Sequence, residues 1–186
     1  SLDEIVCVAP HLFNLDAGRK NKQKVADVIL DGVNVHVVED SMSIALLTRH
    51  LLQEAGASVS HSVNGKLGVE DILSSFDSGQ PPDLILMDMM MPVMDGYESA
   101  RLIKQKSKIF IPIIFLTALA DEKSLAQCIE AGGDDFLTKP YNHILLNSKI
   151  DSMLRIEGLY QNIESKSQAI EEHNLQMLQE MNITKK

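Results

Sequence analysis

Residues 84–96, LILMDMMMPVMDG, decide the fold of this chain. The segment begins with four apolar residues that follow Pro81-Pro82, and this apolar run stops at an acid, Asp88. A short continuous apolar run of this kind predicts a strand that is buried on both faces of a parallel sheet. Asp88 then lies at the carboxyl end of the strand, where open α/β sheets place their binding and catalytic sites. Taken alone, its carboxylate is either a helix cap or a reactive group.

Strand-like and helix-like patterns alternate on both sides of this segment. Strands are predicted at residues 33–38, 59–63, 84–88, 109–116 and 135–138, and helices at 42–55, 68–76, 97–105, 121–131 and from about 142. Such alternation with short connections gives a parallel sheet with helices on both faces, because each crossover is right-handed. The expected fold is a flavodoxin-like, doubly wound, five-stranded parallel sheet in the order 2-1-3-4-5, followed by a long C-terminal helix.

Two local patterns sharpen this prediction. The first helix is expected to start at Ser41, to stop at Gly56, and to turn Ile44, Leu47 and Leu51 toward the core. The strand at 59–63, with the sequence SVSHSV around it, is the most polar and is expected near an edge.

A short helix is also expected at residues 21–30, within a linker or the tail of an upstream element at 1–32.

Length and composition exclude several classes of protein. The 186 residues allow one domain plus tails. A net charge of −9 argues against a direct nucleic-acid binder, and no segment carries the uninterrupted apolar run of a membrane span. The start lacks a signal-peptide pattern and the two distant cysteines, Cys7 and Cys128, match no metal spacing, so we expect a cytoplasmic chain. A chain that begins Ser1-Leu2 without Met indicates a piece of a longer protein.

The predicted strands deliver five polar residues to one edge of the sheet. The first strand ends in Glu39 and Asp40, the third in Asp88, the fourth in Thr117, and the fifth is followed by Lys139. Three neighbouring acids raise one another's pKa unless a cation joins them, and Mg²⁺ favours such carboxylates together with water and phosphate oxygens. An ionised Asp beside Mg²⁺ can accept a phosphoryl group as an acyl phosphate, which a Lys ammonium and a Thr hydroxyl would contact.

Each of these residues also has a purely structural explanation. Lys139 could simply pair with Asp88, Thr117 could be an ordinary residue at a strand end, and Glu39-Asp40 could merely start a helix. Their joint occurrence at the ends of the correct strands favours a functional site.

The stretch from residue 34 to about 151 resembles the receiver domain of two-component response regulators. The matching pieces are VHVVEDS, LILMDMMMPVMDG, IPIIFLTA and AGGDDFLTKPY, in this order. The resemblance implies a receiver domain at 33–152 that accepts a phosphoryl group from a histidine kinase or a phosphotransfer protein and is not otherwise an enzyme. It implies the following roles: Asp88 as phosphoacceptor, Mg²⁺ bound by Glu39, Asp40, Asp88 and the backbone carbonyl of Met90, phosphoryl contacts from Thr117 and Lys139, and a conformational switch at Thr117 and Phe136.

Two positions bear on the rate at which the phosphoryl group on Asp88 would be hydrolysed. Met90 and Leu119 each lie two residues after a site residue, where receiver side chains flank the path of the hydrolytic water. Because both are apolar, we expect slow hydrolysis. Phe136 has no hydroxyl, so a switch there would act through packing alone, and a static core role for it remains an alternative.

The last helix continues past the receiver to about residue 181. Two sets of residues recur every seven positions: Met153, Tyr160, Ser167, Asn174 and Met181 at heptad position a, and Ile156, Ile163, Ile170 and Met177 at position d. This pattern predicts a parallel homodimeric coiled coil through 153–181, with Lys166 of one chain reaching Glu171 of the other. Residues 153–186 are then expected to form a helical linker to an output domain that lies outside this sequence. A single helix folded back on its own domain is the alternative.

Two other functions fit the residues less well. An aspartyl-phosphate phosphohydrolase of the haloacid dehalogenase type would need a second acid two residues after Asp88, where Met90 stands. A receiver-shaped scaffold that never takes phosphate would not need the complete five-residue set.

Overall fold

Five parallel strands of the computed structural model form one sheet in the order β2-β1-β3-β4-β5, which confirms the predicted topology. The structure describes residues 30–107, 109–118 and 122–183, without the side chains of residues 122, 123, 125 and 178–183. Its elements are β1 (Asn34–Val38), α2 (Met42–Glu54), β2 (Ser58–Ser62), α3 (Gly65–Asp77), β3 (Leu84–Asp88), α4 (Gly96–Lys106), β4 (Ile113–Thr117), α5 (Glu122–Glu130), β5 (Asp135–Thr138) and α6 (His143–Ile183).

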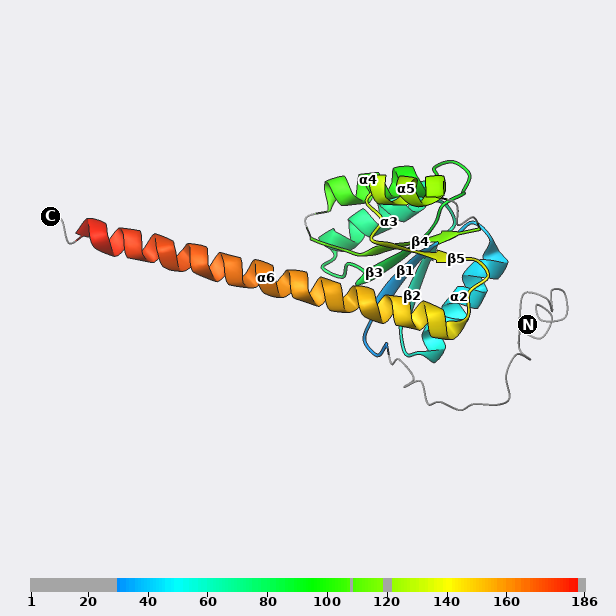
Figure 1. Cartoon of the computed structure of the whole chain (residues 1–186), viewed down its shortest axis with the longest axis horizontal. Helices are drawn as coiled ribbons and strands as arrows, with labels where there is room; N and C mark the ends of the chain where they lie inside the picture. Colours follow the sequence, from blue (N-terminus) through cyan, green and yellow to red (C-terminus); the bar gives the residue numbers. More distant parts are fainter. Residues whose placement is uncertain (1–29, 108, 119–121, 184–186) are drawn as a thin grey trace.

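Helices cover both faces of the sheet. Helices α2 and α6 lie on one face, and α3, α4 and α5 lie on the other (Figure 1). Alternate residues of each strand point to opposite faces, so Leu84 and Leu86 pack toward α2 and α6, whereas Ile85 and Met87 pack toward the other three helices. Full burial of each such side chain contributes roughly 1.5–3 kcal/mol. The central strand therefore holds Asp88 in a rigid frame.

Two predicted elements begin three or more residues away from the expected position. Strand β4 begins at Ile113 and not at residue 109, because Pro112 lacks an N–H and offers the ladder only its carbonyl, which accepts from Ile85 N at 2.9 Å. Helix α3 begins at Gly65, three residues earlier than expected. Its N-cap is Asn64, whose side chain accepts a hydrogen bond from Leu67 N at 3.0 Å.

Helix α2 starts and stops where predicted, but its buried face differs. Ser41 is the N-cap residue, although its side chain makes no capping hydrogen bond. The fully buried residues are Ala45, Thr48 and Leu52, whereas Ile44, Leu47 and Leu51 are only half-buried. The helix is turned so that Thr48 faces inward, where its hydroxyl lies 2.7 Å from Tyr141 Oη, and Ile44, Leu47 and Leu51 are left at the margins of the contact.

Leu30, the first described residue, is buried in the core, and its N–H donates to Ala55 O at 2.7 Å. The short helix expected at 21–30 otherwise lies outside the described residues. At the other end, α6 runs straight past the domain and projects away from it (Figure 1). The alternative in which this helix folds back on its own domain is therefore wrong for the described residues.

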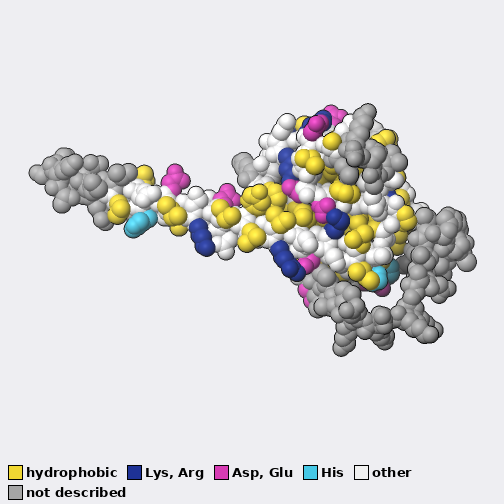
Figure 2. Space-filling model, in the orientation of Figure 1, with side chains coloured by type: hydrophobic (Ala, Val, Ile, Leu, Met, Phe, Trp, Pro, Cys, Tyr) yellow, Lys and Arg dark blue, Asp and Glu magenta, His cyan; other side chains and the backbone are white. Residues whose placement is uncertain are grey.

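The first turns of the projecting helix still contact the domain. Met153 is buried in the core, and the Tyr160 ring stacks on Phe110, with the ring centroids 4.6 Å apart. Met153 and Tyr160, the first two predicted heptad a positions, therefore pack within their own chain. Beyond them, the described apolar side chains of α6, which extend to Met177, are exposed, and Figure 2 shows them as separate patches along the helix.

Candidate functional site

Three carboxylates meet at the carboxyl ends of the central strands. Glu39 and Asp40 directly follow β1, and Asp88 is the last residue of β3. One oxygen of each carboxylate lies within 4.8 Å of the others. Glu39 and Asp88 are buried, whereas Asp40 is exposed, so the group opens to solvent on the Asp40 side. The predicted convergence of these acids is present in the folded chain.

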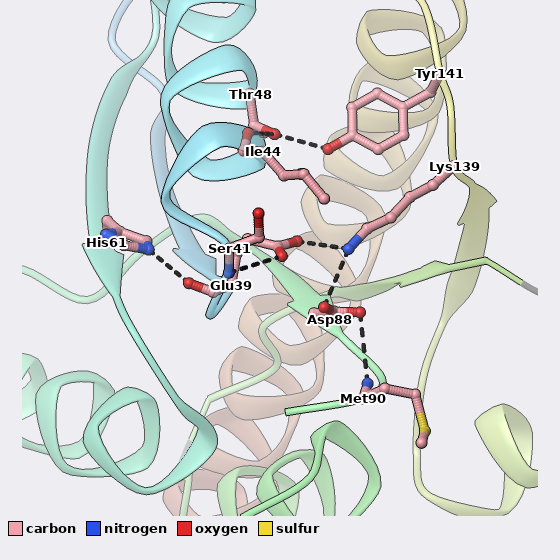
Figure 3. A network of polar contacts seen from close by, with 9 residues as sticks. All are labelled: Glu39, Ser41, Ile44, Thr48, His61, Asp88, Met90, Lys139 and Tyr141. Atoms are coloured by element: carbon pink, nitrogen blue, oxygen red, sulfur yellow. Dashed lines mark hydrogen bonds and ion pairs between the residues drawn. The ribbon is translucent and has the colours of Figure 1, made fainter. Parts of the chain in front are cut away.

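Lys139 joins two of the three acids. Its Nζ lies 2.6 Å from Glu39 Oε2 and 3.1 Å from Asp88 Oδ2 (Figure 3). Burial raises the pKa of the Glu39 carboxyl above its ordinary value, and the hydrogen bond from Lys139 opposes this rise. Lys139 therefore does more than pair with Asp88: its single positive charge is shared by two buried carboxylates.

The loop after Asp88 is shaped by a close approach of two backbone segments. A Cβ on Gly96 would lie 2.1 Å from Asp88 O, so only glycine fits there. The preceding Asp95 caps α4 by accepting from Glu98 N at 2.8 Å. Met90 N lies 3.4 Å from Asp88 Oδ1, and the Met90 side chain points into solvent. The Met90 side chain therefore extends into solvent, whereas Asp88 beneath the loop is buried.

A second loop fixes the position of Lys139. The Lys139-Pro140 peptide bond is cis, and Tyr141 Oη lies 2.7 Å from Thr48 Oγ1 on α2 (Figure 3). Burial raises the pKa of Tyr141 to about 12, so the phenol is neutral at physiological pH. Thr48 Oγ1 also donates to Ile44 O at 2.8 Å, which leaves its lone pairs for the Tyr141 hydroxyl. This contact ties the loop that carries Lys139 to the helix that follows Glu39.

The two predicted switch residues lie on neighbouring strands but at different levels of the sheet. Thr117 ends β4, is buried, and its carbonyl accepts from Lys139 N at 2.7 Å. Its neighbour Leu116 is the register partner of Asp88. Phe136 is half-buried opposite Phe115. Thr117 therefore lies at the carboxyl edge, and Phe136 lies two residues before Thr138, the register partner of Thr117. This arrangement does not test a switch, and Leu119 lies outside the described residues.

The edge strand β2 contributes contacts to the site that the sequence pattern did not predict. Glu39 N donates to Ser62 O at 3.1 Å, and His61 Nε2 lies 2.8 Å from Glu39 O. A second histidine, His36, is buried between Ser60 and Ser62 of the same strand. In the sequence, this contribution is indicated only by a histidine in each of two predicted strands, one of them among serines. The register of β1 and β2 is needed to show that His61 meets the Glu39 carbonyl and that His36 meets the serines.

The acids fit a hard divalent cation such as Mg²⁺. The donors are all carboxylate oxygens from three side chains, and the exposed side at Asp40 leaves room for water or phosphate oxygens. Lys139 neutralises only part of the charge, because one ammonium faces two carboxylates. A bound divalent cation would relieve the remaining repulsion.

A family model described as the response regulator receiver domain matches residues 35–151. The chain belongs to this family. Receiver domains are signalling modules of two-component systems, and they interact with histidine kinases or phosphotransfer proteins. Within the described residues, the structure contains no helix that is both long and apolar enough to cross a membrane.

Several known proteins are similar to this receiver. The alkaline phosphatase synthesis transcriptional regulatory protein PhoP of Bacillus subtilis is 34% identical over 64% of this chain and 47% of that protein. The cyclic di-GMP phosphodiesterase response regulator RpfG of Xanthomonas campestris is 30% identical over 81% of this chain and 39% of that protein. The chain thus spans about half or less of the length of these two relatives.

A solved structure shares both the fold and part of the sequence. The receiver domain of the sensor histidine kinase PA1611 from Pseudomonas aeruginosa is 30% identical, with a TM-score of 0.60 over 66% of this chain and 98% of that domain. That domain holds a magnesium ion coordinated in its active site cleft.

Proposed function

We propose that Asp88 accepts a phosphoryl group from the phosphohistidine of a histidine kinase or a phosphotransfer protein. The observation that carries this proposal is the shared position of Lys139, whose ammonium contacts both Glu39 and Asp88 at the solvent-facing rim of the sheet. A carboxylate held beside a fixed cation is a suitable nucleophile for phosphorus, and a positive charge already stands where the transferred oxygens arrive.

The residues of this chain act mainly by positioning and by charge. An Asp88 oxygen attacks phosphorus as the P–N bond of the phosphohistidine breaks, and the electron pair of that bond remains on the departing imidazole. Lys139 then contacts the transferred phosphoryl oxygens, and Thr117 offers its hydroxyl from the neighbouring strand. Mg²⁺ bound by Glu39, Asp40, Asp88 and the Met90 carbonyl would neutralise charge on those oxygens. We expect slow hydrolysis of the product, because the apolar Met90 side chain offers no strong hydrogen-bonding group to an attacking water.

Intact-mass measurement with acetyl phosphate and Mg²⁺ tests this proposal. We expect one phosphoryl group per chain, removable by hydroxylamine because it is an acyl phosphate, and none on Asp88→Asn. The control Asp77→Asn changes an exposed acid at the end of α3 and should behave like the wild type. Phosphorylation that persists on Asp88→Asn contradicts the proposal, and rapid multiple-turnover release of phosphate would instead indicate a hydrolase.

We infer that the reaction signals through the face of Thr117 and Phe136 into α6. Added negative charge beside Lys139 can bias two conformations of this edge, because a switch of this kind needs only a few kcal/mol. The proposal places the chain in the cytoplasm, where a free thiol such as that of the buried Cys128 persists.

We also propose that a second copy of the chain covers the exposed stripe of α6. The stripe consists of Ile163, Ser167, Ile170, Asn174 and Met177, whose apolar members are 50–66% exposed. It starts after Tyr160, which already stacks on Phe110. Polar residues at two a positions favour a two-stranded parallel pairing, in which Lys166 lies near Glu171 of the other copy.

Two matched variants test this pairing. Ile170→Asp places a charge in the stripe and should convert a dimer to a monomer in sedimentation equilibrium. Leu175→Asp changes an equally exposed apolar residue on another face of the same helix, and should leave the dimer intact. A wild type that is monomeric at high micromolar concentration, or equal masses for both variants, would contradict the pairing.

A further inference from the structure

The peptide that links Glu39 to Asp40 is held from the edge of the sheet. Its carbonyl oxygen, Glu39 O, lies 2.8 Å from His61 Nε2 on β2 (Figure 3). The N–H of Glu39 donates to Ser62 O at 3.1 Å. Both backbone groups of Glu39 are therefore bound by two consecutive residues of β2.

The direction of the His61 contact follows from its chemistry. A carbonyl oxygen can only accept a hydrogen bond, so Nε2 of His61 carries the hydrogen and donates it. This bond fixes the plane of the Glu39–Asp40 peptide. The plane is defined by ψ of Glu39 and φ of Asp40, which set how these two residues are oriented relative to each other. Because Glu39 and Asp40 supply two of the three converging carboxylates, a change in that plane would alter how the two carboxylates meet Asp88.

We propose that His61 is a positioning residue for the divalent-cation site. It acts through the Glu39 carbonyl and contacts neither the cation nor the phosphoryl group. The inference rests on the proposed function, since it concerns the Mg²⁺ needed to phosphorylate Asp88. Groups that hold metal ligands in place typically change metal affinity 10–100-fold when they are removed.

Side-chain hydrogen bonds hold the edge strand β2 in register with β1. His36 on β1 contacts Ser60 Oγ at 2.7 Å and Ser62 Oγ at 2.8 Å. Ser62 Oγ in turn donates to Asp71 Oδ2 on α3 at 2.6 Å. These side-chain bonds add to the backbone ladder between β1 and β2, in which Val37 is the partner of His61. A slip of the strand would break them together, so the register that places His61 beside Glu39 is strongly fixed.

Three substitutions separate the hydrogen bond from the shape of the ring. His61→Phe keeps an aromatic ring without the donor, His61→Ala removes the ring, and His61→Gln supplies an N–H at a similar reach. The measurements on the full chain are Mg²⁺ affinity by calorimetry and the Mg²⁺ dependence of phosphorylation by acetyl phosphate. His50→Ala, at an exposed position on α2 that pairs with Glu54, is the matched control.

We expect His61→Phe and His61→Ala to weaken Mg²⁺ binding at least tenfold. The maximal rate at saturating Mg²⁺ should stay within about twofold of the wild type, since the reacting groups are untouched. His61→Gln should recover most of the affinity, and His50→Ala should match the wild type. Urea unfolding of each variant checks that the comparison is made between folded proteins. If His61→Phe is too unstable to measure, the Mg²⁺ affinities of His61→Gln and His61→Ala are compared with that of the wild type.

The possible failures are distinguishable. Wild-type Mg²⁺ affinity in His61→Phe, or in His61→Ala, overturns the inference while phosphorylation at Asp88 stands. A fall in maximal rate at unchanged Mg²⁺ affinity also overturns it, because the residue would then act on the reaction itself. If His61→Gln binds Mg²⁺ as weakly as His61→Phe, the hydrogen-bond donor of His61 does not determine the affinity, and the inference is overturned. Absence of both Mg²⁺ binding and phosphorylation in the wild type overturns the proposed function and the inference together.

Discussion

Replacement of Lys139 by Met should lower the free energy of unfolding by about 3 kcal/mol at neutral pH without divalent cations. The ammonium lies 2.6 Å from Glu39 Oε2 and 3.1 Å from Asp88 Oδ2, and the Glu39 side chain is only 1% exposed. Removal of one partner leaves buried negative charge uncompensated, which typically costs 3–5 kcal/mol. We take the lower end because the Asp88 side chain retains some contact with water, at 11% exposure.

A double-mutant cycle isolates this interaction. Glu39→Gln removes the most buried charge, so the double variant Glu39→Gln/Lys139→Met should recover a large part of the lost stability. Urea unfolding followed by circular dichroism measures all four proteins. Lys66→Met, at an exposed position in the first turn of α3, is the control and should change stability little. If Lys139→Met proves as stable as the wild type without divalent cations, Lys139 does not hold the two acids together.

Acidification from pH 6.5 to pH 4 should cost the fold about 3 kcal/mol through His36 alone. Burial lowers the pKa of His36 from 6.5 to about 4, although the nearby Asp71 opposes this shift. The unfolded chain therefore binds a proton at pH 5 that the folded chain does not. Stability from this group is fully present above pH 6.5 and is lost as the pH falls toward 4.

The effect is read as a difference between two proteins, because carboxylates titrate over part of the same range. His36→Gln cannot take up a proton, so the wild type should lose stability relative to it between pH 6.5 and pH 4. The ring-proton NMR signals of His36 provide a direct check, with a titration midpoint expected near pH 4. A midpoint near 6.5, or parallel stability curves for the two proteins, would show that the buried ring is not held neutral.

Much of the site follows from the chain itself because strand ends are local features. The apolar run before Asp88 and the β-branched run before Glu39 identify buried strands, and an acid at the end of such a run must lie at the sheet edge. Lys139 and Thr117 follow in the same way from the two other strands. Short connections then leave few topologies, and the observed strand order is the expected one.

Other features depend on distances that no local pattern contains. Helix α2 buries Ala45, Thr48 and Leu52, and this orientation brings the Thr48 hydroxyl to Tyr141, which is 93 positions away in the chain. The heptad pattern of α6 is continuous, yet the Tyr160 ring stacks on Phe110 of its own receiver domain and is not left for a second chain. Sequence periodicity shows which face of a helix is apolar but not which neighbour covers each part of it.

The sequence by itself determined the α/β class, the strand order and the five residues at one edge, because burial pattern and chain order are encoded along the chain. Only the tertiary structure decided that Lys139 is shared by Glu39 and Asp88, that Tyr141 is bonded to Thr48, and that His61 holds the Glu39 carbonyl. These contacts join residues far apart in the chain. Their geometry depends on the register of parallel strands and on the packing of helices against them, and both are set by the folded core as a whole.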